Sequence, residues 1–225
     1  MNKDTSKPAS NAQRAVQELR GLIFSGELAA GSDHLETELA ARLGMSRTPI
    51  REAALMLESQ GLLEMRPRKG VRILPVSASD MREIYDVLTE LESLAAARAA
   101  EAGYSKEELA DLKAAIHDMD QAIKEESLDK WAEADDRFHA ELVRLGDNSR
   151  VSSIVAMMSD QVRRAKASTL FIRPLPVQSN EDHRAVYRAI LKGDADTARR
   201  IHHAHREHAR DILTDLLEKH RIHSL

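Results

Sequence analysis

The chain contains no cysteine and very few aromatic residues. Among its 225 residues, Phe, Trp and Tyr together account for 3%. Without cysteine, the chain can form neither a disulfide scaffold nor a zinc site with thiolate ligands. With so few aromatic rings, its core must consist mainly of Leu, Ile, Val, Ala and Met.

Long apolar runs are also absent. No segment approaches the roughly 20 apolar residues that a membrane-spanning helix needs, and no hydrophobic stretch of a secretory signal opens the chain. Hydrophobic residues make up 42% and charged residues 31%, which is ordinary for a globular protein. The sequence therefore predicts a cytoplasmic protein without a membrane partner, and its length fits two domains.

The chain as a whole has no excess of positive charge, since its net charge is −4. The distribution is uneven, however. Residues 1–74 hold 11 Lys and Arg against 9 Asp and Glu, whereas the remainder holds 22 against 28. A mildly basic first part followed by an acidic second part favours a DNA-binding module joined to a module that does not bind DNA.

Residues 36–61 show the pattern of two helices joined by a tight turn. The segment 36–43 has apolar residues on one face, and Gly44 begins the turn. The hydroxyl of Ser46 is expected to accept a backbone N–H and so cap the second helix. Gly61 is expected to end that helix.

Two strands are expected directly after these helices. Residues 62–66 and 71–74 predict a hairpin with its tip at 67–70. Another helix, beginning with a capping box at Ser10 and Gln13, precedes the pair. This order of elements predicts a winged helix-turn-helix.

Basic residues lie at two ends of the predicted winged helix. A recognition helix enters the major groove by its N-terminal residues, and a basic hairpin tip can contact the adjacent backbone or minor groove. An ordinary solvated basic face is the alternative that charge alone leaves open. On the first interpretation, the candidate DNA contacts are Arg47, Thr48, Arg51, Arg66, Arg68 and Lys69.

The rest of the chain contains no convincing strand. Short loops separate six amphipathic segments, which predict an antiparallel helical bundle. The fold class is therefore mainly α, with a winged helix at 10–75, a helical domain at 76–225 and a disordered terminus at 1–9. The six helices are expected at 79–102, 106–126, 129–145, 151–171, 176–191 and 194–220.

Three of the ten histidines, together with one aspartate, are spaced as metal ligands could be. Asp135 and His139 are four residues apart on one predicted helix, so their side chains point the same way. His183 and His205 lie on the last two predicted helices. One oxygen and three imidazole nitrogens suit zinc, and also nickel, copper or manganese. From spacing alone, a surface pair of Asp135 and His139 remains the alternative.

Several neighbouring residues could alter this assignment. A shift of one helical turn would replace His205 by another histidine. Asp182 is interpreted as a surface acid, and orientation of a metal ligand is its alternative role. The candidates for replacing His205 are His202, His203 and His208, whereas His117, His220 and His223 are interpreted as solvated.

Two stretches resemble a known family. GMSRTPIREAALMLESQGLLEMRPRKGVRI is similar to the winged-helix signature of the GntR family of bacterial transcription regulators. By this resemblance Arg47, Thr48 and Arg51, next to Ser46, take the recognition-helix positions. Lys69 and Gly70 then form the wing tip. The resemblance also implies a homodimer on double-stranded operator DNA.

The second half resembles the FCD ligand-binding domain of the FadR subfamily. The resemblance rests on EADDRFHAELVRLGDNSRV, NEDHRAVYRAILKGDADTARR and the HHAH that follows. Six helices rather than seven are typical of the VanR-like branch. Metal-binding members use an Asp, a His four residues later and two further histidines on the last two helices. This pattern implies the metal ligands Asp135, His139, His183 and His205, with zinc as the leading ion.

Three positions depart from the family pattern. Thr37 stands where a DNA-contacting Arg is common, and His34 where an apolar residue is usual. Leu88 replaces an Arg that often holds an effector carboxylate. Arg163 or Arg164 could replace that cation, with surface salt bridging as the alternative. A purely structural metal is also compatible with the sequence.

The leading hypothesis is a sequence-specific DNA-binding transcription regulator rather than an enzyme. It would act as a repressor controlled by a small metabolite, such as an organic acid, bound at or near the metal. The alternative is a metal-dependent hydrolase with an accessory nucleic-acid domain. A nucleoid protein that binds DNA without sequence preference is a third interpretation.

Overall fold

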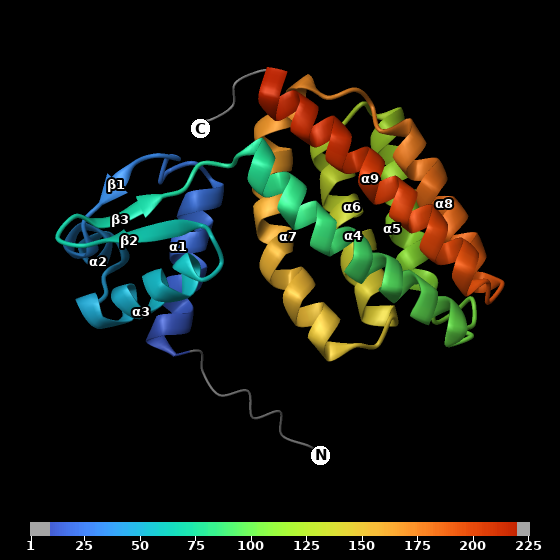
Figure 1. Cartoon of the computed structure of the whole chain (residues 1–225), viewed down its shortest axis with the longest axis horizontal. Coiled ribbons are helices and arrows are strands. Elements are labelled where there is room, and N and C mark those ends of the chain that lie inside the picture. The colour runs from blue at the N-terminus through green and yellow to red at the C-terminus, as the bar shows by residue number, and fades with distance from the viewer. Residues whose placement is uncertain (1–9, 220–225) are drawn as a thin grey trace, which may run out of the picture. The chain divides into compact units, whose positions relative to one another are not determined.

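The computed structural model describes residues 10–219, which form two compact units divided between Val76 and Ser77. The architecture is mainly helical with one small antiparallel sheet, which confirms the predicted fold class (Figure 1). We predicted that residues 1–9 are disordered and that His220 and His223 are solvated. These predictions fall on residues outside the range that the structure describes. Within residues 10–219, no helix is both long and apolar enough to cross a membrane.

The first unit is a winged helix-turn-helix. The antiparallel sheet has the order β1-β3-β2, with Leu63 opposite Ile73 and Asp33 opposite Arg72. Strand β1 was missed in the sequence because two residues are too short to show an alternating pattern. The elements are α1 (Asn11–Phe24), β1 (Asp33–His34), α2 (Glu36–Leu43), α3 (Arg47–Glu58), β2 (Leu63–Arg66) and β3 (Gly70–Ile73).

Local signals in the sequence account for most of these boundaries. The capping box of α1 is confirmed, since the Gln13 backbone N–H donates to Ser10 Oγ at 3.2 Å. Gly61 has a φ of 70° and allows the Leu62 N–H to donate to the Leu57 carbonyl, which ends α3. Ser46 occupies the N-cap position of α3, but its hydroxyl makes no capping hydrogen bond, so that part of the prediction is wrong.

Aliphatic side chains fill the core of the first unit, as the scarcity of aromatic residues predicts. Helix α1 packs against α3, and both contribute fully buried Leu, Ile and Ala side chains. The hairpin closes this core with Val71 and Ile73. The core therefore fixes α3 and the hairpin relative to each other within the unit.

Within the described residues, the second unit is a bundle of six α-helices, the number predicted, together with one short 3₁₀ helix. Helix α4 packs along α9, and α5 packs against α6 (Figure 1). At the end of α6, a Cβ on Gly146 would lie 2.8 Å from the Ala95 Cα, so glycine allows the chain to approach α4 closely. The elements are α4 (Ala78–Glu101), α5 (Ala110–Lys124), α6 (Leu128–Leu145), α7 (Ser149–Thr169), η1 (Leu170–Ile172), α8 (Val177–Leu191) and α9 (Ala195–Lys219).

Helix α5 begins four residues later than predicted. The Ser105 N–H donates to Glu108 Oε2 at 2.9 Å, and the Glu108 N–H donates to Ser105 Oγ at 3.3 Å. These two hydrogen bonds hold the segment before Ala110 as a turn rather than as the first turn of the α-helix.

Candidate DNA interface and candidate metal site

The N-terminus of α3 presents two exposed arginines. The side chains of Arg47 and Arg51 are 66% and 64% exposed, and Ser46 and Thr48 beside them are also exposed. Glu36 of α2 lies between the two guanidinium groups, with Oε2 3.5 Å from Arg47 and Oε1 3.7 Å from Arg51. These contacts orient both arginines while leaving most of their surface free to meet a phosphate or a base edge.

The hairpin tip presents two further exposed cations, Arg68 and Lys69. Arg68 adopts a left-handed conformation with a φ of 65°, and Gly70 follows with a φ of 84°. A Cβ at position 70 would lie 2.1 Å from the His34 carbonyl oxygen, so this close approach requires glycine. The structure thus gives Gly70 a packing role at the base of the tip.

Arg66 differs from the tip cations because acidic residues surround it. Its guanidinium lies 3.2 Å from Asp33 and 3.4 Å from Glu64, and Arg72 lies 3.6 Å from the same Asp33. These ion pairs offset part of its charge. Arg66 is therefore a weaker candidate for a phosphate contact than Arg68 or Lys69.

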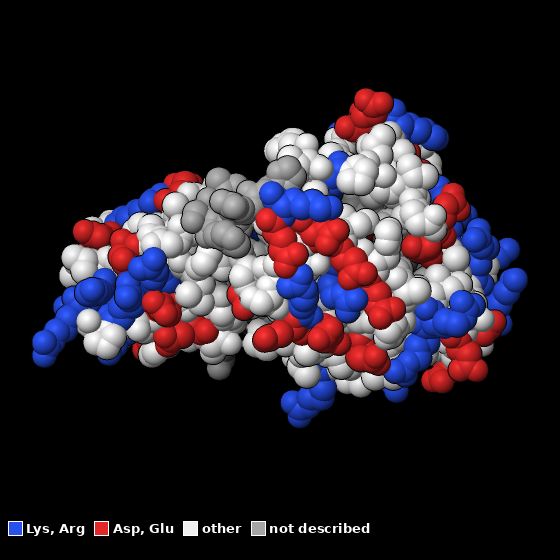
Figure 2. Space-filling view, turned by 45° about the horizontal axis from the view of Figure 1, so that its top comes forward, with Lys and Arg blue, Asp and Glu red and all other residues white. Residues whose placement is uncertain are grey.

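A concave surface joins the two cationic parts of the first unit. Arg47 and Arg51 of α3 line this surface together with Arg66 and Arg68 of the hairpin. Figure 2 shows Lys and Arg side chains gathered at the left end of the view, over this unit. The structure thus brings two of the predicted recognition-helix arginines and two hairpin arginines to one surface.

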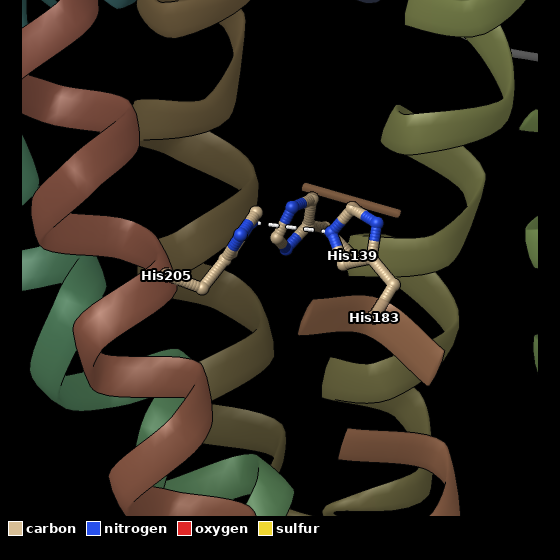
Figure 3. Close-up of side chains that lie close together, drawn as sticks. All are labelled: His139, His183 and His205. Carbon is tan, nitrogen blue, oxygen red and sulfur yellow. Dashed lines mark hydrogen bonds between the residues drawn. The ribbon is translucent and has the colours of Figure 1, made fainter. Parts of the chain in front are cut away.

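Three helices of the second unit bring together the four candidate metal ligands. Asp135 and His139 lie on α6, His183 on α8 and His205 on α9, and all four are buried. The three imidazoles point toward one another in Figure 3. His183 Nε2 lies 3.1 Å from His205 Nε2 and 3.5 Å from Asp135 Oδ1, and His139 Nε2 lies 3.6 Å from the same oxygen.

These distances and donor types fit a divalent metal ion. Zinc–nitrogen bonds of about 2.0–2.1 Å place two ligands roughly 2.9 Å apart at a right angle and roughly 3.4 Å apart at a tetrahedral angle. The separations of 3.1, 3.5 and 3.6 Å lie at or just beyond this range. One proton can satisfy only a single pair among these converging lone pairs, whereas one ion can satisfy all of them.

Buried charges determine the protonation of this cluster. Burial opposes ionisation of Asp135, but Lys166 and His139 outweigh it and hold the Asp135 pKa well below its ordinary value. Lys166 Nζ lies 2.6 Å from Asp135 Oδ2. Burial lowers the pKa of His183 and of His205, which keeps both imidazoles in the neutral form that binds metals.

A second acid, which the sequence reasoning missed, contacts the cluster from α4. Glu92 is buried, and its Oε2 lies 2.8 Å from His139 Nδ1. Burial disfavours its charge, but Arg206 and His139 more than compensate and lower the Glu92 pKa far below its usual range. The available signal was an acidic residue in line with Tyr85 and Leu88 on the apolar face of α4.

His202 and His203, which also lie on α9, differ in the residues that they contact. His202 is buried with its Nε2 3.6 Å from Glu92 Oε2, and its ring centre lies 5.5 Å from that of His139 and 5.9 Å from that of His205. His203 turns to Glu90 and Glu207 at 3.1 and 3.3 Å. His205 is the α9 histidine whose Nε2 lies 3.1 Å from His183 Nε2.

Asp182 contacts the cluster in a way that supports the alternative considered from the sequence. Its Oδ2 lies 3.5 Å from His205 Nδ1, on the side of the ring opposite the converging Nε2 atoms. Burial opposes its ionisation, but the contacts with His205 and Gln178 outweigh burial and lower the Asp182 pKa. Asp182 is thus positioned to orient the His205 ring.

A partly open cavity of about 230 Å³ adjoins the four-residue cluster. Its cationic lining residues are Lys166, Arg173 and Arg206. Arg163 and Arg164, the cations considered from the sequence, are not among them, and Arg163 Nε instead donates to Asp136 at 2.8 Å. The lining consists of Tyr85, Trp131, Asp135, His139, Lys166, Arg173, Pro174, Leu175, Pro176, Gln178, Ser179, His205, Arg206, His208, Ala209 and Ile212.

Comparisons with known proteins match both units. Residues 11–73 match the model of the bacterial regulatory proteins, gntR family, and residues 83–208 match the model of the FCD domain. An HTH-type transcriptional regulator in an unstable DNA locus of Streptomyces ambofaciens is 31% identical over 222 residues, covering 96% of this chain and 88% of the relative.

The HTH-type transcriptional repressor RspR of Escherichia coli strain K12 is 27% identical over 188 residues, covering 84% of this chain and 82% of the relative. Among solved structures, E. coli McbR/YncC matches with a TM-score of 0.75 over 92% of this chain and 98% of that chain. Its sequence identity is 20%, so this likeness supports the fold alone.

Proposed function

The chain belongs to the GntR family of bacterial regulatory proteins and carries an FCD domain, and we propose that it is a repressor controlled by an anionic metabolite bound beside a divalent metal ion. It is a transcription regulator, and its relative RspR is named a repressor. The alternative of a metal-dependent hydrolase finds no support in these relatives.

The observation that carries the metal proposal is the convergence of Asp135, His139, His183 and His205 in a buried position. Placing four such groups together in a bundle core costs stability unless they are satisfied. A bound zinc, nickel, copper or manganese ion would satisfy them and would offer an open coordination position to a carboxylate. The ligand ring nitrogens and the Asp135 oxygen would hold the ion.

Charge balance supports an anionic effector. Asp135 and Glu92 are the buried acids around the site, and Lys166 and Arg206 are the buried cations that face them. These four buried charges balance, so a divalent ion would add two positive charges, which the more exposed Asp182 and Asp136 would offset only in part. Arg173 would add another from the cavity wall. An anion is therefore the ligand that this enclosure favours.

The rest of the cavity suits an apolar body. Tyr85, Trp131, Leu175 and Ile212 line it together with the cations. A volume of about 230 Å³ accommodates a small molecule rather than a peptide. We therefore propose a small organic acid, with its carboxylate toward the metal and its carbon skeleton against these side chains.

The first unit would read the operator. Arg47, Thr48 and Arg51 would enter the major groove, and Arg68 and Lys69 would contact the neighbouring backbone. In a homodimer, two such units would bind the two halves of a pseudo-palindromic site. Effector binding would shift the equilibrium between two dimer arrangements, which requires a different affinity for each arrangement.

The metal proposal is tested by the metal content of the purified full chain after loading and removal of free ions. We expect about one equivalent in the wild type, almost none in the double variant His183→Ala with His205→Ala, and about one in the control His203→Ala. The control removes a histidine from the same helix that contacts Glu90 and Glu207 instead. Equal metal content in the wild type and the double variant would refute the assignment.

A further inference from the structure

Glu92 lies at the centre of a buried polar network that connects the proposed metal site with the cavity. Its Oε2 is 2.8 Å from His139 Nδ1 and 3.6 Å from His202 Nε2. Its other oxygen, Oε1, is 3.5 Å from Arg206 Nη2. Arg206 also lines the cavity, where its guanidinium lies 4.5 Å from the centre of the Tyr85 ring.

Glu92, His139 and His202 could by themselves hold a second metal ion, because one ligand atom from each lies within 4.8 Å of the others. Two contacts argue against this interpretation. The Arg206 guanidinium would repel a second cation at short range. Glu92 Oε2 and His139 Nδ1 are 2.8 Å apart, which is the separation of an ion pair between a carboxylate and a protonated ring nitrogen.

The contact with His139 has a chemical consequence. An imidazole can bind a metal through one nitrogen only when the proton sits on the other. A carboxylate 2.8 Å from Nδ1 favours the proton on that atom. The lone pair is then on Nε2, the atom that lies 3.6 Å from Asp135 Oδ1 within the four-residue cluster.

We infer that Glu92 is the positioning residue of the metal site, holding His139 in the tautomer that binds the ion through Nε2 while its second oxygen pairs with Arg206 in the cavity wall. This inference rests on the proposed metal site. Asp182 contacts His205 Nδ1 from outside the cluster in a similar way, at 3.5 Å. Each of these two ligand histidines therefore has a carboxylate beside the ring nitrogen that faces away from the ion.

The network also predicts that binding of the metal ion and binding of the anion in the cavity influence each other. An anion that draws Arg206 toward the cavity would change the charge that Glu92 presents to His139. By thermodynamic reciprocity, metal binding would then change the affinity for the anion. Glu92 is the residue through which both effects would pass, because it contacts His139 and Arg206 at once.

The test compares the affinity of zinc for the full-length wild type and for two Glu92 variants, measured by competition with a chromophoric chelator. Glu92→Met removes both oxygens at similar length, and Glu92→Gln keeps one acceptor oxygen. We expect the affinity to fall by about 10- to 100-fold in Glu92→Met and by a smaller factor in Glu92→Gln. The matched control is Glu90→Gln, since Glu90 lies on the same helix, is largely exposed and contacts Arg199 and His203.

A second measurement does not depend on the folding of a variant. Nitrogen NMR of zinc-loaded wild type should show His139 protonated at Nδ1 and metal-bound at Nε2. Zinc on Nδ1, or wild-type affinity in both Glu92 variants, would overturn the role of Glu92 while leaving the metal site intact. Two zinc ions per wild-type chain would instead identify the Glu92 group as a second site. Absence of zinc binding by the wild type would overturn the metal proposal itself.

Discussion

Replacing Lys166 by methionine separates the structural role of the buried charges from their role in binding. Lys166 Nζ lies 2.6 Å from Asp135 Oδ2, and the two side chains are only 9% and 3% exposed. Removing one partner of such a pair leaves the other charge buried without compensation, which typically costs about 3–5 kcal/mol. His139 lies 3.6 Å from Asp135 and can take up a proton, so we expect about 3 kcal/mol in the metal-free protein.

A loss of this size corresponds to a fall in melting temperature of roughly 10 °C for a chain of this length. Metal loading should reverse most of the loss, because the ion would compensate the charge of Asp135 in place of the ammonium group. Lys166→Met should also bind the ion more tightly than the wild type, since a neighbouring positive charge has been removed. The metal should therefore stabilise the variant more than it stabilises the wild type.

The assay is thermal unfolding followed by circular dichroism, with chelator and with excess zinc. Lys130→Met is the control, because Lys130 forms an exposed pair with Glu125 and should behave like the wild type in both conditions. A metal-free Lys166→Met that melts with the wild type would refute the energetic argument. A variant destabilised equally with and without zinc would exclude Asp135 as a ligand.

Two further predictions concern DNA affinity and pH. Arg47→Ala and Arg51→Ala should each weaken operator binding, measured by fluorescence anisotropy, by about 1–3 kcal/mol. The control Arg42→Ala, which removes the partner of Glu27, should leave operator affinity unchanged. Equal losses of affinity in all three variants would contradict the recognition-helix assignment. Burial lowers the pKa of His183, His202 and His205, while Glu92 and Asp135 outweigh burial and raise that of His139. Near the ordinary histidine pKa of about 6.5, the unfolded chain therefore binds more protons than the folded chain. The free energy of unfolding of the metal-free protein should consequently fall as the pH is lowered from about 7 to about 5. The slope should be at most about 1.4 kcal/mol per pH unit for each net proton. Denaturant titrations at several pH values measure this slope, and a stability that rises on acidification would contradict the assigned shifts.

The parts of the fold that could be predicted are those specified by neighbouring residues. The capping box at Ser10 and the turn glycine at Gly61 act within a few positions, and the structure reproduces both. Helix α5 was predicted too long because the reciprocal cap of Ser105 and Glu108 resembles the first turn of a helix in sequence. Strand β1 escaped notice because it exists only through pairing with β3.

The same distinction applies to the candidate site. Asp135 and His139 were predictable as a pair because four residues separate them on one helix. Glu92, Lys166 and Arg206 lie on other helices, and sequence spacing does not show which buried charge faces which partner. Arg163 and Arg164 were considered on the basis of charge alone. Helical geometry brings the buried Lys166 of the same helix to 2.6 Å from Asp135, whereas the exposed Arg163 contacts Asp136 and Asp160.

The energetic cost of the cluster argues for a binding role. A bundle of this size needs no charges in its core, and well-packed apolar residues in place of a buried ion pair are often neutral or stabilising. This unit instead buries Asp135, Glu92, Lys166 and Arg206 together with four histidines, namely His139, His183, His202 and His205. The eight groups lie on five helices that line the same cavity rather than being dispersed through the core. The energetic cost of these buried groups is thus concentrated beside the cavity through which a metal ion and an anion would enter. Such a concentration is expected where residues serve ligand binding rather than stability.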